Sequence, residues 1–215
     1  MHAPQEEQVM SKVLLICNTV QTGTWLKKLA KQADFVLAAD GGANVALAVG
    51  IIPDAVIGDL DSVSPRTRRA LQDTPFIHVK RQDNTDLEKA LDWITAQRFD
   101  TCFIVGATGG RLDFTLGNIL AVRPYLNKIQ IQFCGPDWTL FALCKGCTFQ
   151  ARKGARCSFI PLSTCKSVSL KGMKYCVKKQ NWDTHHIGRS LSNQITAATS
   201  QVSFTGGLLL MYLEH

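Results

Sequence analysis

The sequence predicts a protein of two parts, a parallel-sheet α/β domain followed by an antiparallel β-sandwich domain. Residues 12–136 alternate short apolar runs with helix-like stretches, which is typical of a sheet covered by helices. From about Thr139 the runs become shorter and are separated by glycine or polar turns, which is typical of antiparallel strands. With 215 residues, of which 46% are hydrophobic and 19% are charged, the chain can bury a core in each part.

The candidate strands of the first part are apolar runs bounded by turn residues. They are Val13–Cys17, Phe35–Ala39, Ala55–Ile57, Phe76–Val79, Cys102–Val105 and Ile129–Phe133. The stretches between them have helical periodicity, and they are Trp25–Lys31, Asn44–Val49, Pro65–Leu71, Asp86–Gln97 and Leu112–Val122. Nearly continuous apolar strands that alternate with helices indicate a parallel sheet, which binds ligands beyond the carboxyl ends of its strands.

The second part contains only candidate strands, and we expect no helix in it. The candidates are Thr139–Cys144, Thr148–Arg152, Cys157–Pro161, Ser167–Leu170, Tyr175–Lys178, Val202–Thr205 and Leu208–Leu213. The junction is expected at Gly135-Pro136-Asp137. The expected domains therefore span residues 12–136 and 137–213.

Charge and cysteine content exclude several classes of protein. The net charge is +7, but the basic residues of the second part stand singly or in pairs without interleaved aromatics, which disfavours nucleic acid and suits a polyanionic small molecule. No apolar stretch approaches the ~18 residues of a membrane span, and the polar, acidic start is unlike a signal peptide, so we expect a cytoplasmic protein. The eight cysteines are expected to be reduced, and Cys144 and Cys147 lack the second CxxC pair of a zinc site.

Four polar clusters follow candidate strands of the first part, where a ligand is expected. They are Asp40–Asn44, Gly58–Ser62, Gln82–Glu88 and Gly106–Asp113. Their glycines admit a ligand close to the backbone, and the last cluster adds an arginine, whose planar guanidinium suits phosphate. Oxygen ligands gathered without cysteine or histidine suit Mg²⁺. The clusters therefore predict a nucleotide-binding domain that transfers a phosphorus group with the help of a metal. The Walker pattern is absent, so the domain is not expected to be a P-loop enzyme.

The carboxylates of the second and third clusters have informative spacing. Asp59 and Asp61 stand two positions apart after a buried strand, so both can point to one side and reach one metal. Two like charges so close together are unfavourable without a cation. Thr85 and Glu88 have the spacing of a capping box, which predicts a helix that begins at Asp86.

Together, these clusters resemble those of thiamine pyrophosphokinases. Members of that family carry a DGGAN-like turn, a GDxDS turn, a DxTD helix start and a GGRxDH-like loop, followed by a β-domain with GLKY and SN motifs. In this sequence the motifs stand in the same order at Asp40–Asn44, Gly58–Ser62, Asp83–Asp86, Gly109–Asp113, Gly172–Tyr175 and Ser192-Asn193. The resemblance covers residues 12–213.

The resemblance implies transfer of the pyrophosphoryl group of ATP to the hydroxyl of thiamine, with Mg²⁺ as cofactor and AMP as second product. It also implies a homodimer whose active sites lie between the nucleotide domain of one chain and the thiamine-binding β-domain of the other. By motif match, Asp59, Asp61 and Asp86 would hold Mg²⁺, and Arg111 and Asp113 would complete the catalytic set. The implied ATP-binding residues are Asp40, Gly41, Gly42, Asn44, Thr108, Gly109, Gly110 and Arg111, and the implied thiamine-binding residues are Gln82, Tyr175, Ser192 and Asn193.

The sequence departs from the family pattern at Phe114, where members often carry histidine. Phenylalanine cannot exchange a proton, so this position cannot supply a general base. Trp182 and His185-His186 lie in a longer, more polar stretch, which we expect to be a surface loop. Two alternatives stay open: a pyrophosphokinase for another heterocycle such as a pterin, and a nucleotide or RNA sensor built on the basic second part. A sensor does not need a complete metal set, so the presence of Asp59, Asp61, Asp86 and Arg111 argues against it.

Overall fold

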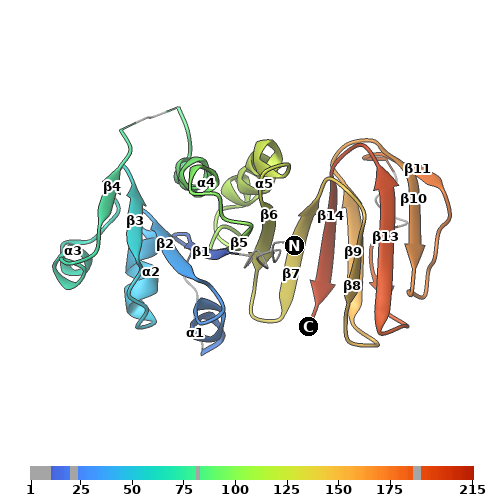
Figure 1. Ribbon diagram of the computed structural model, residues 1–215, viewed down its shortest axis with the longest axis horizontal. Helices are drawn as coiled ribbons and strands as arrows, with labels where there is room; N and C mark the ends of the chain where they lie inside the picture. The colour runs from blue at the N-terminus through green and yellow to red at the C-terminus, as the bar shows by residue number, and fades with distance from the viewer. Residues whose placement is uncertain (1–10, 20–23, 81–82, 186–189) are drawn as a thin grey trace, which may run out of the picture. The chain divides into compact units, whose positions relative to one another are not determined.

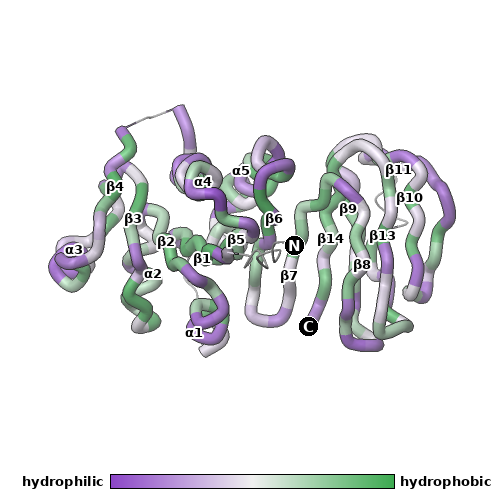
Figure 2. Tube along the Cα trace, in the orientation of Figure 1, coloured by the Kyte–Doolittle hydropathy of each residue, from purple (hydrophilic) through white to green (hydrophobic). Residues whose placement is uncertain are grey.

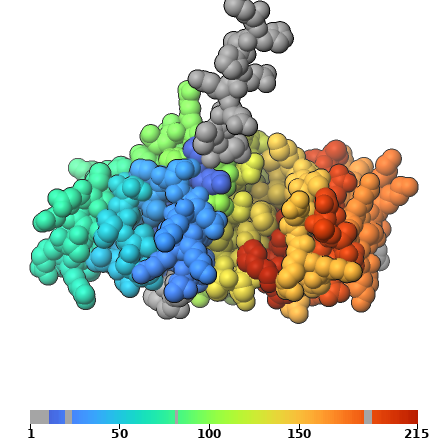
Figure 3. Space-filling view, turned by 60° about the horizontal axis from the view of Figure 1, so that its bottom comes forward, coloured from blue at the N-terminus to red at the C-terminus, as the bar shows by residue number. Residues whose placement is uncertain are grey.

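The computed structural model describes residues 11–19, 24–80, 83–185 and 190–215. The chain forms two compact units, one that ends at Gly106 and one that begins at Ala107. Figure 1 and Figure 3 colour the chain from blue to green through the first unit and on to red through the second. In the described part of the chain, no helix has both the length and the apolar character needed to cross a membrane.

The first unit contains five parallel strands in the order β5-β1-β2-β3-β4. Their bounds are β1 Lys12–Ile16, β2 Phe35–Ala39, β3 Ala55–Gly58, β4 Phe76–His78 and β5 Thr101–Val105. Residues 13–16 of β1 are completely buried, and this strand is correspondingly hydrophobic in Figure 2. The parallel pairing agrees with the prediction from the alternating apolar runs.

The face of the sheet that each helix of this unit covers depends on the direction in which the chain moves along the sheet. Three of them lead from β1 to β4 in one direction, and they are α1 Thr24–Ala30, α2 Gly42–Ala48 and α3 Pro65–Ala70. The helix α4, Asp86–Ala96, instead returns the chain to β5, on the other side of β1. Because parallel crossovers are right-handed, α4 lies on the opposite face from α2, as Figure 1 shows. The direction reverses at β1, and sheets of this kind bind ligands beside such a reversal.

The second unit begins with α5 Leu112–Ala121 and the 3₁₀ helix η1 Arg123–Tyr125. Two sets of antiparallel strands follow, in the orders β12-β9-β14-β7-β6 and β11-β10-β13-β8. Their bounds are β6 Gln130–Cys134, β7 Trp138–Leu143, β8 Cys147–Gln150, β9 Arg156–Pro161, β10 Cys165–Lys171, β11 Gln180–Trp182, β12 Asn193–Gln194, β13 Thr199–Thr205 and β14 Leu209–Glu214. As predicted, the described residues after Tyr125 form no helix.

One hydrophobic cluster joins the two sets of strands in this unit. Phe159 of β9 and Met211 of β14 contribute to it from one set, and Val202 of β13 contributes from the other. The strand β6, which the sequence assigns to the first part, pairs antiparallel with β7 in this unit.

Two local predictions for the second unit are wrong. Residues 175–178 are not a strand. At their first position, the side-chain amide of Asn193 takes up both backbone hydrogen-bonding groups of Tyr175, so this residue cannot pair with a neighbouring strand. The stretch expected to be a surface loop instead contributes the edge strand β11, in which Trp182 is buried in the hydrophobic cluster. Within that stretch His185 is exposed, as predicted, and His186 lies outside the described residues.

Candidate active site

Asp40 lies directly after β2, at the carboxyl edge of the strands in the first unit. Its backbone N–H donates to the carbonyl of Ile57 at 2.8 Å, and its φ of 44° turns the chain toward α2. Gly41 and Gly42 allow a close approach here. A Cβ on Gly42 would lie 2.0 Å from the carbonyl oxygen of Ile16. A Cβ on Gly41 would lie 2.5 Å from the side chain of Asn18. The glycine pair therefore lets α2 begin against β1, with Asp40 held at the strand ends.

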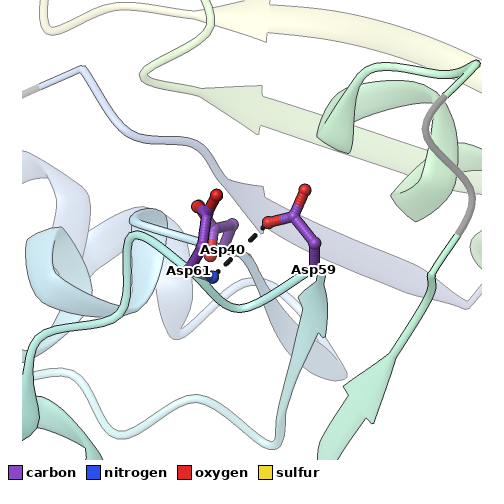
Figure 4. Close-up of side chains that lie close together, drawn as sticks. All are labelled: Asp40, Asp59 and Asp61. Carbon is purple, nitrogen blue, oxygen red and sulfur yellow. Dashed lines mark hydrogen bonds between the residues drawn. The ribbon is translucent and has the colours of Figure 1, made fainter.

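Asp59 and Asp61 follow β3 and lie beside Asp40. One carboxylate oxygen from each of the three residues lies within 4.8 Å of the others. Figure 4 shows the three side chains beside one another, Asp40 after β2 and the other two after β3. The backbone N–H of Asp61 donates to Asp59 Oδ1 at 3.4 Å. Leu60, between them, has a φ of 68°, so the turn itself brings the two carboxylates together. Asp40, which the sequence assigns to ATP binding, is the third carboxylate of this group.

Asn44 holds the loop after β3 in place. Its Nδ2 donates to the carbonyl of Ser62 at 2.8 Å, and its Oδ1 accepts from the backbone N–H of Ser64 at 3.0 Å. The backbone N–H of Ser62 donates in turn to Asp40 Oδ1 at 3.3 Å. The amide that the sequence assigns to ATP binding thus positions the loop that carries Asp61.

The helix α4 begins at Asp86, as the capping box predicts. Thr85 Oγ1 accepts from the backbone N–H of Glu88 at 3.2 Å, and Glu88 Oε2 accepts from the backbone N–H of Thr85 at 2.9 Å. Asp86 does not belong to the group of three carboxylates found among the described residues. Its Oδ1 instead accepts from Lys89 Nζ at 2.9 Å, one turn further along the helix.

Lys89 joins Asp86 to Asp59, and the sequence does not predict this role. Its Nζ lies 3.1 Å from Asp59 Oδ2, and its side chain is only 4% exposed. The hydrogen bond from Lys89 is the main reason that the pKa of Asp59 is lowered, whereas burial raises the pKa of Asp86 in spite of the same donor. Burial alone would lower the pKa of Lys89, but its bonds to the two carboxylates outweigh burial and raise it, so Lys89 stays charged. The signal in the sequence is the position of Lys89, three residues after Asp86, which places both side chains on the same face of the helix.

The glycine loop before α5, in the second unit, carries Arg111 and Asp113. Nε and Nη2 of Arg111 donate to the two carboxylate oxygens of Asp113 at 3.1 and 2.6 Å, and both side chains are exposed. These hydrogen bonds raise the pKa of Arg111 and lower that of Asp113. Phe114 stacks on the guanidinium, with its ring centroid 4.6 Å from Arg111 Cζ. Within residues 108–110, Gly109 has a φ of 86°, which favours glycine.

Tyr175, Ser192 and Asn193, which the family resemblance implies for thiamine binding, lie together in the second unit. They line a pocket of about 260 Å³ together with Gly154, Arg156, Lys174, Gln194 and Glu214. Asn193 is buried, and its amide accepts from the backbone N–H of Tyr175 at 3.0 Å and donates to its carbonyl at 2.7 Å. The Tyr175 ring is exposed, and Ser192 adopts a φ of 57°. Gln82, the fourth candidate, lies outside the described residues.

Known proteins match the chain over both units. Residues 26–133 match the family described as "Thiamin pyrophosphokinase, catalytic domain", and residues 147–209 match "Thiamin pyrophosphokinase, vitamin B1 binding domain". A thiamine pyrophosphokinase of Bacillus subtilis (strain 168) is 32% identical over 182 residues, which cover 80% of this chain and 83% of that protein. Thiamine pyrophosphokinase 1 of Oryza sativa subsp. japonica is 28% identical over 138 residues, which cover 57% of this chain and 52% of that protein.

Solved structures agree with these matches. The crystal structure of thiamine pyrophosphokinase from Bacillus subtilis has a TM-score of 0.81 and 25% sequence identity, and the match covers 95% of this chain and 99% of that one. Yeast thiamin pyrophosphokinase has a TM-score of 0.81 at 18% identity, covering 98% of this chain and 88% of that one, which shows the same fold. Family match, sequence identity and fold thus lead to one conclusion: the chain belongs to the thiamin pyrophosphokinase family.

Proposed function

We propose that this chain catalyses the Mg²⁺-dependent transfer of the pyrophosphoryl group of ATP to the hydroxyl of thiamine, which yields thiamine diphosphate and AMP. The observation that carries the proposal is the group of three carboxylates at the ends of β2 and β3, in a member of this family. Relatives that match most of the chain are named for this activity.

The acidic group has the donor chemistry that Mg²⁺ prefers. Mg²⁺ takes oxygen ligands and usually binds through one or two carboxylates together with substrate phosphates and water. Asp59, Asp61 and Asp86 are the proposed ligands, and the position of Asp40 beside the first two makes it a fourth candidate. When bound there, the ion would supply charge neutralisation for the transferring group and orientation of its oxygens.

The remaining candidates divide between the two substrates. Arg111 is proposed to bind phosphate, because its guanidinium is exposed and already makes the bidentate contact that phosphate also accepts. Asp113 is proposed to lie beside the reacting groups, and the glycine turns at 41–42 and 108–110 are proposed to admit ATP. Thiamine is proposed to bind at the pocket lined by Tyr175, Ser192 and Asn193.

We also propose the domain division at residues 12–136 and 137–213, with a nucleotide-binding α/β domain and a thiamine-binding β-sandwich. The hydrophobic cluster that receives side chains from both antiparallel sets supports the sandwich. The family match that begins at residue 147 supports assignment of vitamin B1 to the second domain.

A homodimer with shared active sites is proposed for the assembly. The helix α5 supports it, because none of its residues is buried and four large apolar side chains on it are exposed: Leu112, Phe114, Leu116 and Leu120. An apolar surface of this kind marks an interaction site, and a second copy of the chain is the proposed occupant.

Incubation of the purified protein with ATP, Mg²⁺ and thiamine tests the proposed reaction, with AMP and thiamine diphosphate separated by chromatography. We expect the two products in equal amounts and no AMP when thiamine is left out. A parallel reaction replaces thiamine with a hydroxymethylpterin. AMP formed only with the pterin would favour the alternative pyrophosphokinase, and no AMP with either acceptor would contradict the proposal.

A further inference from the structure

Lys89 is a buried cation within the acidic site. Burying an ammonium group is unfavourable unless it is paired, and Lys89 satisfies this condition with two carboxylates, Asp59 and Asp86. The side chain is 4% exposed, and α4 holds it in position from one turn beyond Asp86. Its charge is therefore a fixed part of the site.

The two oxygens of Asp59 face different partners. Oδ2 accepts from Lys89 Nζ at 3.1 Å, whereas Oδ1 accepts from the backbone N–H of Asp61 at 3.4 Å. Asp59 thus divides the acidic residues into two sides. One side holds Lys89 with Asp86, and the other holds Asp61 with Asp40, whose carboxylate oxygens lie within 4.8 Å of one another and of Asp59.

We propose that Lys89 is a positioning residue that serves as a built-in counter-ion on the Asp86 side of Asp59 and restricts the nucleotide-free site to a single divalent cation on the Asp40–Asp61 side. The inference rests on the proposed Mg²⁺ site: before ATP binds, its ion is held by Asp40, Asp59 and Asp61, and Asp86 becomes a ligand only with the nucleotide bound. Without the ammonium, Asp59 and Asp86 would be two like charges with no cation between them, an arrangement that favours uptake of a metal ion. With it, the two carboxylates are already held together, and a second divalent ion is repelled.

Titration with Mn²⁺ in the absence of ATP and thiamine tests this role, with free Mn²⁺ measured by electron paramagnetic resonance. The variants are Lys89→Met, which removes the charge, and Lys89→Arg, which keeps it. Lys28→Met, at an exposed lysine of α1, is the matched control. We expect a single Mn²⁺ per chain for the wild type, Lys89→Arg and Lys28→Met. Lys89→Met should bind a further Mn²⁺ and bind the first about tenfold more tightly. Identical titrations for Lys89→Met and the wild type, or no Mn²⁺ bound by either, would overturn the inference.

Thermal unfolding gives a second readout that a purely structural lysine would not change. Lys89→Met should lose stability in chelator and regain it in Mn²⁺, so its Mn²⁺-induced rise in Tm should exceed that of the wild type by about 4 °C or more. An equal loss of Tm by Lys89→Met in chelator and in Mn²⁺ would contradict the inference. Failure of the variant to fold in both media would also contradict it, because Mn²⁺ should replace the ammonium. If Lys89→Met folds only in Mn²⁺, the inference is supported.

A double variant assigns the additional Mn²⁺ to its ligand. Asp86→Asn/Lys89→Met removes the ammonium and the carboxylate together, so it should return to a single Mn²⁺ per chain. A further Mn²⁺ retained by the double variant would exclude Asp86 and overturn the proposed division of the site. Because no substrate is present, a negative result in the AMP assay leaves these titrations interpretable, and the two failures can be told apart.

Discussion

Gly58 ends β3 at the point where the acidic side chains meet. Its φ is 147°, a conformation that disfavours residues with a side chain. A Cβ there would lie 3.0 Å from Asp40 Cβ and 3.4 Å from Asp86 Oδ1. At the scale of single residues, the carboxylates of the site therefore come together because the backbone between them carries no side chain.

We expect Gly58→Ala to lower the free energy of unfolding by about 1–3 kcal/mol, because it adds backbone strain and displaces Asp40 or Asp86. The AMP-forming activity should fall with it. Gly206→Ala is the control, since Gly206 also has a positive φ, 64°, but a Cβ there would meet open space. Denaturant unfolding of the two variants measures the difference. Equal losses of stability, with activity retained in Gly58→Ala, would show that crowding at Gly58 is unimportant.

At the scale of elements, α4 links stability to the site because its first turns carry Asp86 and Lys89. The capping box of Thr85 and Glu88 fixes where this helix begins. The helix α3 is capped similarly, by Ser64, whose Oγ accepts from the backbone N–H of Thr67 at 3.1 Å. The helix α3 carries none of the acidic site residues, but Arg68 on it donates to the carbonyl of Leu60 in their loop, so its cap provides a comparison in which the site is affected indirectly.

Thr85→Ala and Ser64→Ala should each lower the free energy of unfolding by about 1 kcal/mol, the usual cost of losing an N-cap. Thr85→Ala should lower kcat more than Ser64→Ala does, because fraying of α4 displaces Asp86 itself, whereas α3 only supports the loop that carries Asp61. Steady-state kinetics beside denaturant unfolding separates the two effects. The same kinetic loss in both variants would contradict the link between the α4 cap and the site.

The elements that the sequence predicts well are those whose signal is local. The capping box gives the start of α4, and continuous apolar runs give the parallel strands. Trp182 is misplaced because a three-residue edge strand acquires its pairing only from β10. Residues 175–178 alternate like a strand, yet a distant asparagine satisfies the backbone of Tyr175. The role of Lys89 depends on Asp59, thirty positions earlier. Contacts of this kind leave no local pattern.

At the scale of the whole molecule, we propose that each active site combines parts of two chains. The acidic group belongs to the first unit, and the pocket with Tyr175 belongs to the second. A twofold dimer repeats the same interface on both chains, so each dimer would contain two composite sites. The exposed apolar side chains of α5 support such an assembly.

Subunit exchange between two inactive variants tests this arrangement. We choose Asp61→Ala and Tyr175→Ala, because the exposed Tyr175 ring can be removed without disturbing the buried amide of Asn193. A hybrid dimer has one site with both lesions and one with neither. With random exchange about half the dimers are hybrids, so roughly a quarter of wild-type activity should return. Hybrids that a tagged pull-down detects but that remain inactive would place each site within one chain.

The most direct test of the central claim, that the acidic group at the sheet edge performs the transfer, is the rate of AMP formation by Asp61→Asn. The change is nearly isosteric, and Asp61 is exposed, so the fold and Tm should be retained. At saturating ATP, thiamine and Mg²⁺, we expect the rate to fall about 100-fold or more, because charge positioned for the transition state is lost. Asp73→Asn, at an exposed aspartate beyond α3, should keep the wild-type rate. Wild-type turnover by Asp61→Asn would contradict the central claim.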